Sequence, residues 1–362
     1  MVTPGQRETK ARSTRSPSGL PGLCLRAHDG RLARVAELVV IIVNYDSGER
    51  LRACVASVLA QQPRPPRVMV VDNASHDDSA KGLPEGVEVL HREHNDGFAP
   101  ALNAAIAAST EPLLFTLNPD TLLEPGCLAQ LTEALHADLR AGAVAPLVLQ
   151  LDAPTRVDAS GIGLTSRMGQ INWDHGLAAD EVPDHPRDVL GPLGGAALWR
   201  RVALERAGGF SRHFFLYWED MDMALRLNRA GYECRTVHGA RVLHEGSGIV
   251  GRWSSLNVFY MVRNHWQCLL GALPGPLLLR SLPAIALAPF RAAALYAGRG
   301  RVLAAAAGLI CGAALIPGAL LRRRYLPRTG ASHKAAERMA TLLAAADENR
   351  LLMKSAGSRA EP

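Results

Sequence analysis

The sequence predicts an α/β fold with a mostly parallel central sheet, followed by a hydrophobic helical region. Two continuous apolar runs, in residues 38–45 and 67–75, are typical of strands buried on both faces of a parallel sheet. Residues 47–62 lie between them with apolar side chains at helical spacing, so the three segments form a βαβ unit. The second run and a later one, residues 112–120, both reach an aspartate where the apolar run stops. Ligands bind at the carboxyl ends of such strands, which places two carboxylates along one crevice.

The rest of the first 250 residues continues the alternation of strands and helices. Residues 152–190 contain recurring Gly, Asp and Pro without a clear period, and a segment of this length is more typical of a functional excursion than of a simple connector. The further predicted elements are strands at 87–90, 142–151 and 234–246, helices at 100–109 and 122–136, and core segments at 191–201 and 208–232.

Composition excludes a disordered protein and places the basic charge at the two ends. The 362 residues are 48% hydrophobic, enough for one large domain with or without a small appendage. The net charge is +6, but residues 1–35 hold seven Lys or Arg against two acids, and residues 322–362 hold nine against four. Such basic arms are typical of proteins that bind nucleic acid or an anionic membrane surface. The apolar segments near the carboxyl end, described below, favour the membrane. We therefore expect no nucleic-acid partner.

The cysteines and the amino terminus point to a reducing compartment. Six cysteines are widely spread, without CxxC or His/Cys pairs at metal spacing, so neither a disulfide framework nor a structural zinc site is indicated. Residues 1–19 lack the apolar centre of a signal peptide. We expect residues 1–36 to form a disordered basic arm.

Six blocks of the chain resemble one known family. They read VNYDSGERLRACVASVLAQ, VVDNAS, NDGFAPALNAAI, LNPD, GGFSRHFFLYWEDMDMALRL and VLHEGS, in that order, over residues 38–270. Together they are similar to family 2 glycosyltransferases, particularly bacterial rhamnosyltransferases. The resemblance implies a GT-A fold and an inverting transfer from a nucleotide sugar. A dinucleotide-dependent oxidoreductase would need GxGxxG after the first strand, where this chain reads NYDSGE.

The resemblance implies a set of donor-binding residues. Asp72 corresponds to the residue that hydrogen-bonds the base or ribose, although DNAS is also good turn or capping chemistry. The family usually has Gly where Ala101 stands, next to an unusual Pro100. The other candidates for the nucleotide sugar are Asn44, Asn95, Gly97, Asn103 and Asn118.

The resemblance also implies a divalent cation, Mg²⁺ or Mn²⁺, bridging the donor diphosphate. Asp120 stands at the last position of the family's DxD motif, and Asn118 replaces the first Asp. His244 matches a family histidine found near the metal or diphosphate, but HEGSG departs from the usual HxxGxS. The alternative for Asp120 is an Asn-Pro-Asp turn that caps the following helix. The alternative for His244 is an ordinary core or surface histidine without a ligand.

Asp220 resembles the family's catalytic base. An ordinary aspartate is a weak base, so burial among neighbouring aromatic and acidic side chains would have to raise its pKa. Asp222 has two open interpretations, an active-site role or an i to i+4 ion pair with Arg226. The residues that resemble the loop beside the acceptor and donor sugar are Gly194, Gly195, Trp218 and Glu219, and for the two glycines a simple tight turn is the alternative.

Two apolar segments follow, residues 277–297 and 302–321. The second is uncharged and, as a helix, about 30 Å long, enough to cross a bilayer. Arginines flank it on both sides, so a single span would violate the positive-inside rule. We therefore expect in-plane or re-entrant helices on the cytoplasmic leaflet, with a soluble helical subdomain as the alternative. The predicted divisions are 37–270 for the transferase, 271–325 for membrane-associating helices and 326–362 for a basic polar tail.

These expectations combine into one functional prediction. The donor is dTDP-rhamnose, and the acceptor is a saccharide or a polyprenyl-linked saccharide of a cell-envelope polysaccharide. The protein acts peripherally or monotopically on the cytoplasmic face of the plasma membrane. The alternatives are another donor (UDP-hexose, UDP-N-acetylhexosamine or UDP-galactofuranose) and a noncatalytic membrane scaffold with the same fold.

Overall fold

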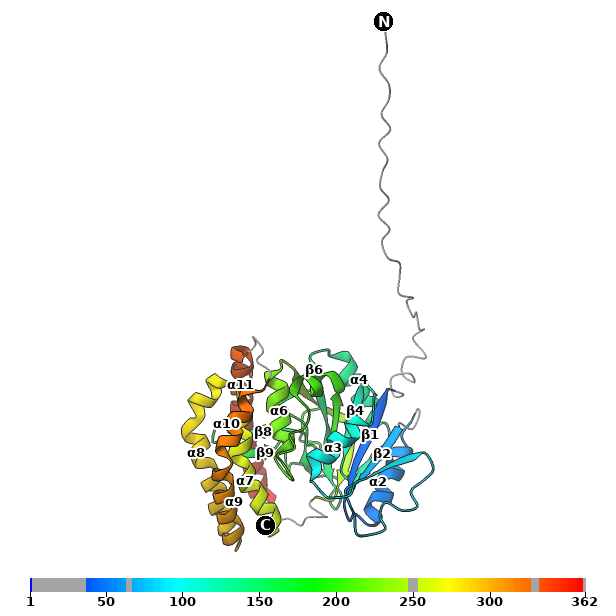
Figure 1. The fold of residues 1–362 in the computed structure, drawn as a ribbon, viewed down its shortest axis with the longest axis horizontal. Coiled ribbons are helices and arrows are strands. Elements are labelled where there is room, and N and C mark those ends of the chain that lie inside the picture. The colour runs from blue at the N-terminus through cyan, green and yellow to red at the C-terminus, as the bar shows by residue number, and fades with distance from the viewer. Residues whose placement is uncertain (2–36, 63–66, 247–252, 327–331, 361–362) are drawn as a thin grey trace.

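The structure is a computed structural model that describes, besides Met1, residues 37–62, 67–246, 253–326 and 332–360. All of the predicted basic arm except Met1 therefore lies outside the described residues. A twisted sheet occupies the first two thirds of the chain, and a group of helices stands beside it (Figure 1).

Most strands of the sheet point the same way. The order is β10-β12-β6-β11-β4-β1-β2-β3, and β1, β2, β3 and β4 are mutually parallel neighbours. Strand β11 runs antiparallel to both β4 and β6, so β6 has the direction of β4, and β12 is parallel to β6. The carboxyl ends of six strands thus meet at one edge. The six strands are β1 (Leu38–Asn44), β2 (Arg67–Asp72), β3 (Val87–His91), β4 (Leu113–Leu117), β6 (Ala141–Gln150) and β12 (Glu233–His244), whereas β11 (Ala196–Arg200) runs in the opposite direction.

Helices cover both faces of this sheet because its central strands are apolar on both sides. All seven residues of β1 are buried, with alternate side chains entering two separate cores. One core contains α2 (Glu49–Leu59) and α4 (Cys127–Ala137). The other contains α3 (Phe98–Ala107), α5 (Arg201–Ala207) and α6 (Glu219–Arg229).

Two regions differ from the simple predicted pattern. Within the predicted helix 122–136, the first residues form β5 (Thr121–Leu123), which pairs with β12, because Pro125 and the left-handed Gly126 delay the helix until Cys127. The excursion 152–190 holds short strands that extend the sheet or pair with each other. They are β7 (Val157–Ala159) on β6, β10 (Asp188–Val189) on β12, and the hairpin of β8 (Ile162–Leu164) with β9 (Gln170–Asn172).

The remaining helices pack on the side of α6. Helix α8 continues unbroken through Pro283 and Pro289, whereas α9 and α10 are bent by 44° at their junction. Helix α11, in the segment predicted as a basic polar tail, buries Met339 and Ala346 against the protein. The bounds are α7 (Ser255–Ala272), α8 (Gly275–Ala297), α9 (Val302–Ala314), α10 (Ile316–Arg324) and α11 (Ser332–Ala360).

Among the described helices, α8 alone has the length and composition to cross a membrane by itself, and α9 with α10 would do so as a bent pair. In α8, 39% of the apolar window is already buried against the protein.

Candidate active site

Asp72 and Asn44 end two adjacent strands and contact each other. Asn44 is fully buried and donates from Nδ2 to Asp72 Oδ1 across 3.1 Å, and to the hydroxyls of Ser75 and Ser79. The other Asp72 oxygen lies 3.3 Å from His91 Nδ1. Asn44 therefore orients Asp72 from the neighbouring strand and is itself closed off from solvent.

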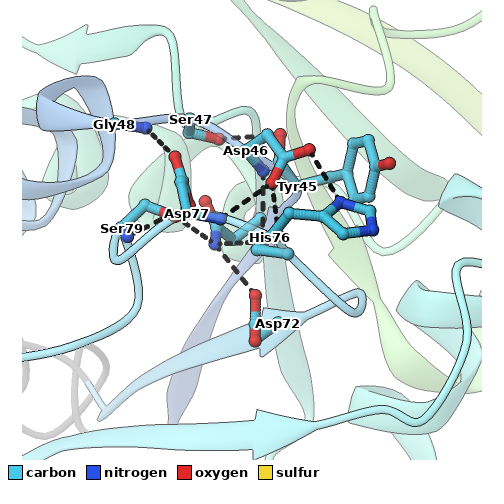
Figure 2. A network of polar contacts seen from close by, with 10 residues as sticks. Tyr45, Asp46, Ser47, Gly48, Asp72, His76, Asp77 and Ser79 are labelled. Atoms are coloured by element: carbon cyan, nitrogen blue, oxygen red, sulfur yellow. Dashed lines mark hydrogen bonds and ion pairs between the residues drawn. The ribbon is translucent and has the colours of Figure 1, made fainter.

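Figure 2 shows that the loops after β1 and β2 are tied together next to Asp72. Asp46 accepts hydrogen bonds from the backbone amides of His76 and Asp77, at 2.6 and 3.2 Å. In the reverse direction, Asp77 accepts from the amide of Gly48 at 2.9 Å. These bonds fix two polar loops side by side at the carboxyl end of the sheet.

Asn95 and Gly97 close the same side of the site. Asn95 Oδ1 accepts from Asn73 Nδ2 at 2.7 Å and from the amide of Gly97 at 3.0 Å. Gly97 has a φ of +98°, and a Cβ there would lie 2.2 Å from the carbonyl oxygen of Phe215. Glycine is required because the loop before Asp220 packs directly on this backbone.

Asn103 lies apart from these residues. It donates to the carbonyl of Phe210 at 2.7 Å and accepts from the amide of the same residue at 3.1 Å. Both ends of the amide side chain thus join α3 to the chain just before residues 214–218, the aromatic loop.

Asp120 and His244 meet at the carboxyl ends of β4 and β12. His244 Nε2 lies 3.6 Å from Asp120 Oδ1, and its Nδ1 lies 2.7 Å from Asp158 Oδ2. Burial by itself lowers the pKa of His244, but the two carboxylates outweigh burial and raise that pKa to about 10. His244 therefore lies between two carboxylates, one facing each ring nitrogen.

Arg50 and Glu245 border the same corner. The Arg50 guanidinium makes two bonds to the Glu245 carboxylate, at 2.5 and 2.7 Å, and the amide of Glu245 donates to the carbonyl of Asp120. The ion pair with Glu245 raises the pKa of Arg50, and the charge of Asp120 adds to this shift. One fixed positive charge thus lies close to the Asp120 corner.

A divalent cation fits this corner in part. Asp120 Oδ1 is buried and makes no hydrogen bond to any described residue, so a carboxylate oxygen is left for a ligand. No group of three His, Cys, Asp or Glu side chains suited to a metal ion occurs among the described residues. Asp120 and His244 could supply two ligands, and Mg²⁺ or Mn²⁺ would need the remainder from phosphate and water.

Asp220 is joined to the same edge through Gly194. The Gly194 amide lies 3.4 Å from Asp220 Oδ2, and its carbonyl accepts from Thr116 Oγ1 at 2.7 Å, at the end of β4. Next to it, the Gly195 carbonyl accepts from the Asn118 amide at 2.8 Å, and a Cβ on Gly195 would lie 2.5 Å from the Asn118 side chain. The two glycines allow the chain to pass between the carboxylate and the strand.

Asp220 and Glu219 have the electrostatics of proton-transfer groups. Burial raises the pKa of Asp220 above its ordinary value. Burial and the adjacent Asp220 charge together raise the pKa of Glu219 to about 8. Glu219 Oε2 is buried without a hydrogen-bond partner among the described residues. Two neighbouring acids that resist ionisation provide a base of the required strength.

The turn that presents Asp220 is strained. Tyr217 and Trp218 have φ values of +66° and +73°, unusual for side chains of this size. Asn264 of α7 holds this turn by donating to the carbonyls of Leu216 and Tyr217, both at 2.9 Å. Trp218 itself is buried at 2% exposure and donates from its indole to Met261, so its side chain belongs to the core.

Asp222 forms the predicted i to i+4 ion pair with Arg226, at 2.7 Å, and is fully buried. It also accepts from Arg322 of α10. The contacts with Arg226 and Arg322 therefore explain the buried Asp222 carboxylate without an active-site role.

Sequence reasoning did not single out Asp158, Asn264, Arg50 or Asp46. Glu245 could have been noticed, because it directly follows His244. Asp158 and Asn264 carried no signal, because each acts on a residue that is distant in sequence.

The chain matches two family descriptions and a curated relative. The chain matches the description "Glycosyl transferase family 2" over residues 39–169 and "Glycosyl transferase family group 2" over residues 113–299. It is 29% identical over 239 residues to the N-acetylglucosaminyl-diphospho-decaprenol L-rhamnosyltransferase of Mycobacterium tuberculosis, which covers 59% of this chain and 78% of that protein.

Two solved structures share the fold. The mannosyltransferase PcManGT of Pyrobaculum calidifontis, in complex with GDP-Man and Mn²⁺, aligns over 86% of each chain with a TM-score of 0.50 and 21% identity. GalNAc-T7 with UDP, GalNAc and Mn²⁺ aligns over 62% of this chain and 47% of its own, with a TM-score of 0.52 and 17% identity. The predicted GT-A fold is confirmed, and the chain belongs to the family 2 glycosyltransferases.

Proposed function

We propose that the protein is a metal-dependent inverting transferase that moves rhamnose from dTDP-rhamnose to a saccharide or polyprenyl-linked saccharide acceptor. The observation that carries this proposal is the convergence of Asp72, Asp120 and Asp220, from three distant parts of the chain, at one edge of the sheet. The name of the mycobacterial relative, a rhamnosyltransferase with a decaprenol-linked substrate, supports the choice of donor and acceptor class.

The donor half of the site would use the first two loops. Asp72 binds the base or ribose, and Asn44 acts through Asp72 because it is fully buried beside it on the neighbouring strand. Asn95, Gly97 and Asn118 shape the wall against which the nucleotide sugar lies. Asn103 supports this wall from α3 through Phe210.

Asp120 and His244 would hold Mg²⁺ or Mn²⁺. When bound, the cation neutralises charge on the nucleotide diphosphate as it departs. Asp120 would offer Oδ1, which makes no hydrogen bond to a described residue, and His244 would offer Nε2, 3.6 Å away.

Asp220 would take the proton of the acceptor hydroxyl. The oxygen then attacks the anomeric carbon from the side opposite the diphosphate, the bond to the leaving oxygen breaks, and the configuration inverts. Gly194 and Gly195 let the sugars approach closely, while Glu219 and the backbone at Trp218 set the position of the base. Because the pKa of Asp220 is raised, activity rises with pH through a range above that of an ordinary aspartate.

We also propose that residues 271–325 dock on the cytoplasmic leaflet beside a transferase domain of residues 37–270. Large apolar side chains remain exposed on α8 and α9, among them Leu279, Leu287, Leu303 and Ile310. Arg322 and Arg323 at the end of α10 bond to α6 and α7. These contacts hold the end of the helical region against the transferase, and its start follows directly from α7, so both ends would lie on one side, as a monotopic protein requires.

The test is a product assay with a panel of nucleotide sugars, with and without Mn²⁺, on wild type and Asp220→Asn. We expect transfer from dTDP-rhamnose that requires the metal and falls at least about 100-fold in the variant. Transfer from another donor would redirect the donor assignment. Equal turnover in both proteins would remove Asp220 from its role, and no turnover with any donor would favour a noncatalytic scaffold.

A further inference from the structure

We propose that Asp158 is a positioning residue that holds His244 in the orientation and tautomer needed to bind the divalent cation. This inference rests on the proposed function, because it assumes that Asp120 and His244 are metal ligands. Its starting point is geometric. His244 lies between two carboxylates, with Nδ1 at 2.7 Å from Asp158 and Nε2 at 3.6 Å from Asp120.

The short contact is on the side away from the candidate metal corner. A hydrogen bond from Nδ1–H to Asp158 leaves the lone pair of Nε2 directed toward Asp120, whose Oδ1 has no hydrogen-bond partner among the described residues. A histidine that binds a metal through one nitrogen needs a proton on the other, and a carboxylate that accepts this proton fixes both tautomer and ring orientation.

The sheet holds Asp158 and His244 in a fixed relation. Strand β7 pairs with the end of β6 at Leu149↔Val157 and Val148↔Ala159, and β12 pairs with the other side of β6 at His244↔Gln150. His175 supports Asp158 from the far side, with Nδ1 at 2.9 Å from its backbone carbonyl. The loop-rich excursion thus contributes one side chain to the catalytic edge.

A purely structural salt bridge makes a different prediction. If Asp158 only stabilises the fold, its removal lowers the melting temperature and leaves metal affinity alone. If it positions His244, its removal weakens metal binding by about 10- to 100-fold, the range for carboxylates that orient ligating histidines.

The experiment measures Mn²⁺ binding to the full-length protein, by the electron paramagnetic resonance signal of free Mn²⁺, alone and with dTDP or UDP. The variants are Asp158→Ala and Asp158→Asn, with Asp120→Ala and His244→Ala as references. Asp152→Asn, an exposed acid at the start of the same excursion, is the matched control. Asp158→Asn keeps an acceptor for Nδ1–H, so we expect a smaller loss than in Asp158→Ala and unchanged affinity in the control.

The outcomes separate the inference from the function on which it rests. Wild-type affinity in both Asp158 variants, with loss in Asp120→Ala, overturns the positioning role and leaves the metal site intact. Unchanged affinity in Asp120→Ala and His244→Ala, or no Mn²⁺ binding by the wild type, overturns the metal site itself. If circular dichroism shows that Asp158→Ala does not fold, the Mn²⁺ affinity of Asp158→Asn decides whether Asp158 has the positioning role.

Discussion

Arg322, in the last turn of α10, donates a hydrogen bond to Asp222 in α6 across 3.2 Å. The same guanidinium donates to Ser211 Oγ and to the backbone carbonyl of Gln267. One side chain therefore joins the end of the apolar helices to α7 and to the helix that begins with Glu219 and Asp220. The transferase and the helical region are connected through a buried charge.

We expect Arg322→Ala to destabilise the protein by about 1–3 kcal/mol. The loss stays below that of a fully broken buried pair because Arg226 still neutralises Asp222. Arg322→Lys restores only part of this, since an ammonium cannot match three acceptors with a planar fork. Urea unfolding measures the change, with the exposed Arg324→Ala as control. Equal stabilities of the two alanine variants would show that the Asp222 contact is unimportant.

Strands β1, β2 and β4 were predictable because each is a mainly apolar, buried run with Asn or Asp at or shortly after its carboxyl end. The edge that gathers Asp72 and Asp120 follows from strand direction alone. The roles of Asp158, Asn264 and Arg322 did not follow, because each acts on a residue at least 47 positions away. Nor could the sequence predict that the Asn103 side chain makes both of its hydrogen bonds to the backbone of Phe210.

We expect Glu219→Gln to change how stability depends on pH. The unfolded chain loses this proton near the ordinary pKa of 4.5, whereas the folded protein keeps it up to about 8. Between those values folding takes up a proton, so wild-type stability falls with rising pH by up to about 1.4 kcal/mol per unit. The variant has no proton to lose and lacks this fall.

Unfolding free energies between pH 5 and 8.5 measure this difference, with the exposed Glu205→Gln as control. Parallel curves for wild type and Glu219→Gln would mean that Glu219 is ionised in the folded protein.

We expect Gly97→Ala to disrupt the contact between the backbone at Gly97 and the aromatic loop at Phe215. The added Cβ would lie 2.2 Å from the Phe215 carbonyl oxygen, which must move. Gly86→Ala is the matched control, since its φ of +87° imposes similar backbone strain with no atom within 4 Å of the new Cβ. The control loses about 1 kcal/mol from strain alone. Gly97→Ala should lose clearly more and bind nucleotide more weakly in calorimetry, and equal losses would exclude the steric explanation.

Asn264→Ala should lower kcat more than stability alone explains. Without the two bonds to Leu216 and Tyr217, the left-handed turn can relax and displace Asp220, and a shift of about 1 Å costs roughly 100-fold in rate. Asn349→Ala removes another buried amide, which donates to Asp174 at 2.6 Å, and is the control for general destabilisation. The rates are compared at a temperature where both variants are folded. Equal kcat values would limit Asn264 to a structural role.

The exposed apolar face of α8 and α9 should carry membrane binding. Leu287, Leu303 and Ile310 are 55%, 85% and 71% exposed, a costly arrangement in water. Burying a leucine or isoleucine side chain contributes about 1.5–3 kcal/mol, so replacing all three with Gln should reduce partitioning onto phosphatidylglycerol vesicles more than about 100-fold. Leu139→Gln, at an equally exposed position beyond α4, should leave partitioning unchanged. Vesicle flotation measures both. If the triple variant floats like the wild type, this face packs against something other than lipid and the monotopic arrangement fails.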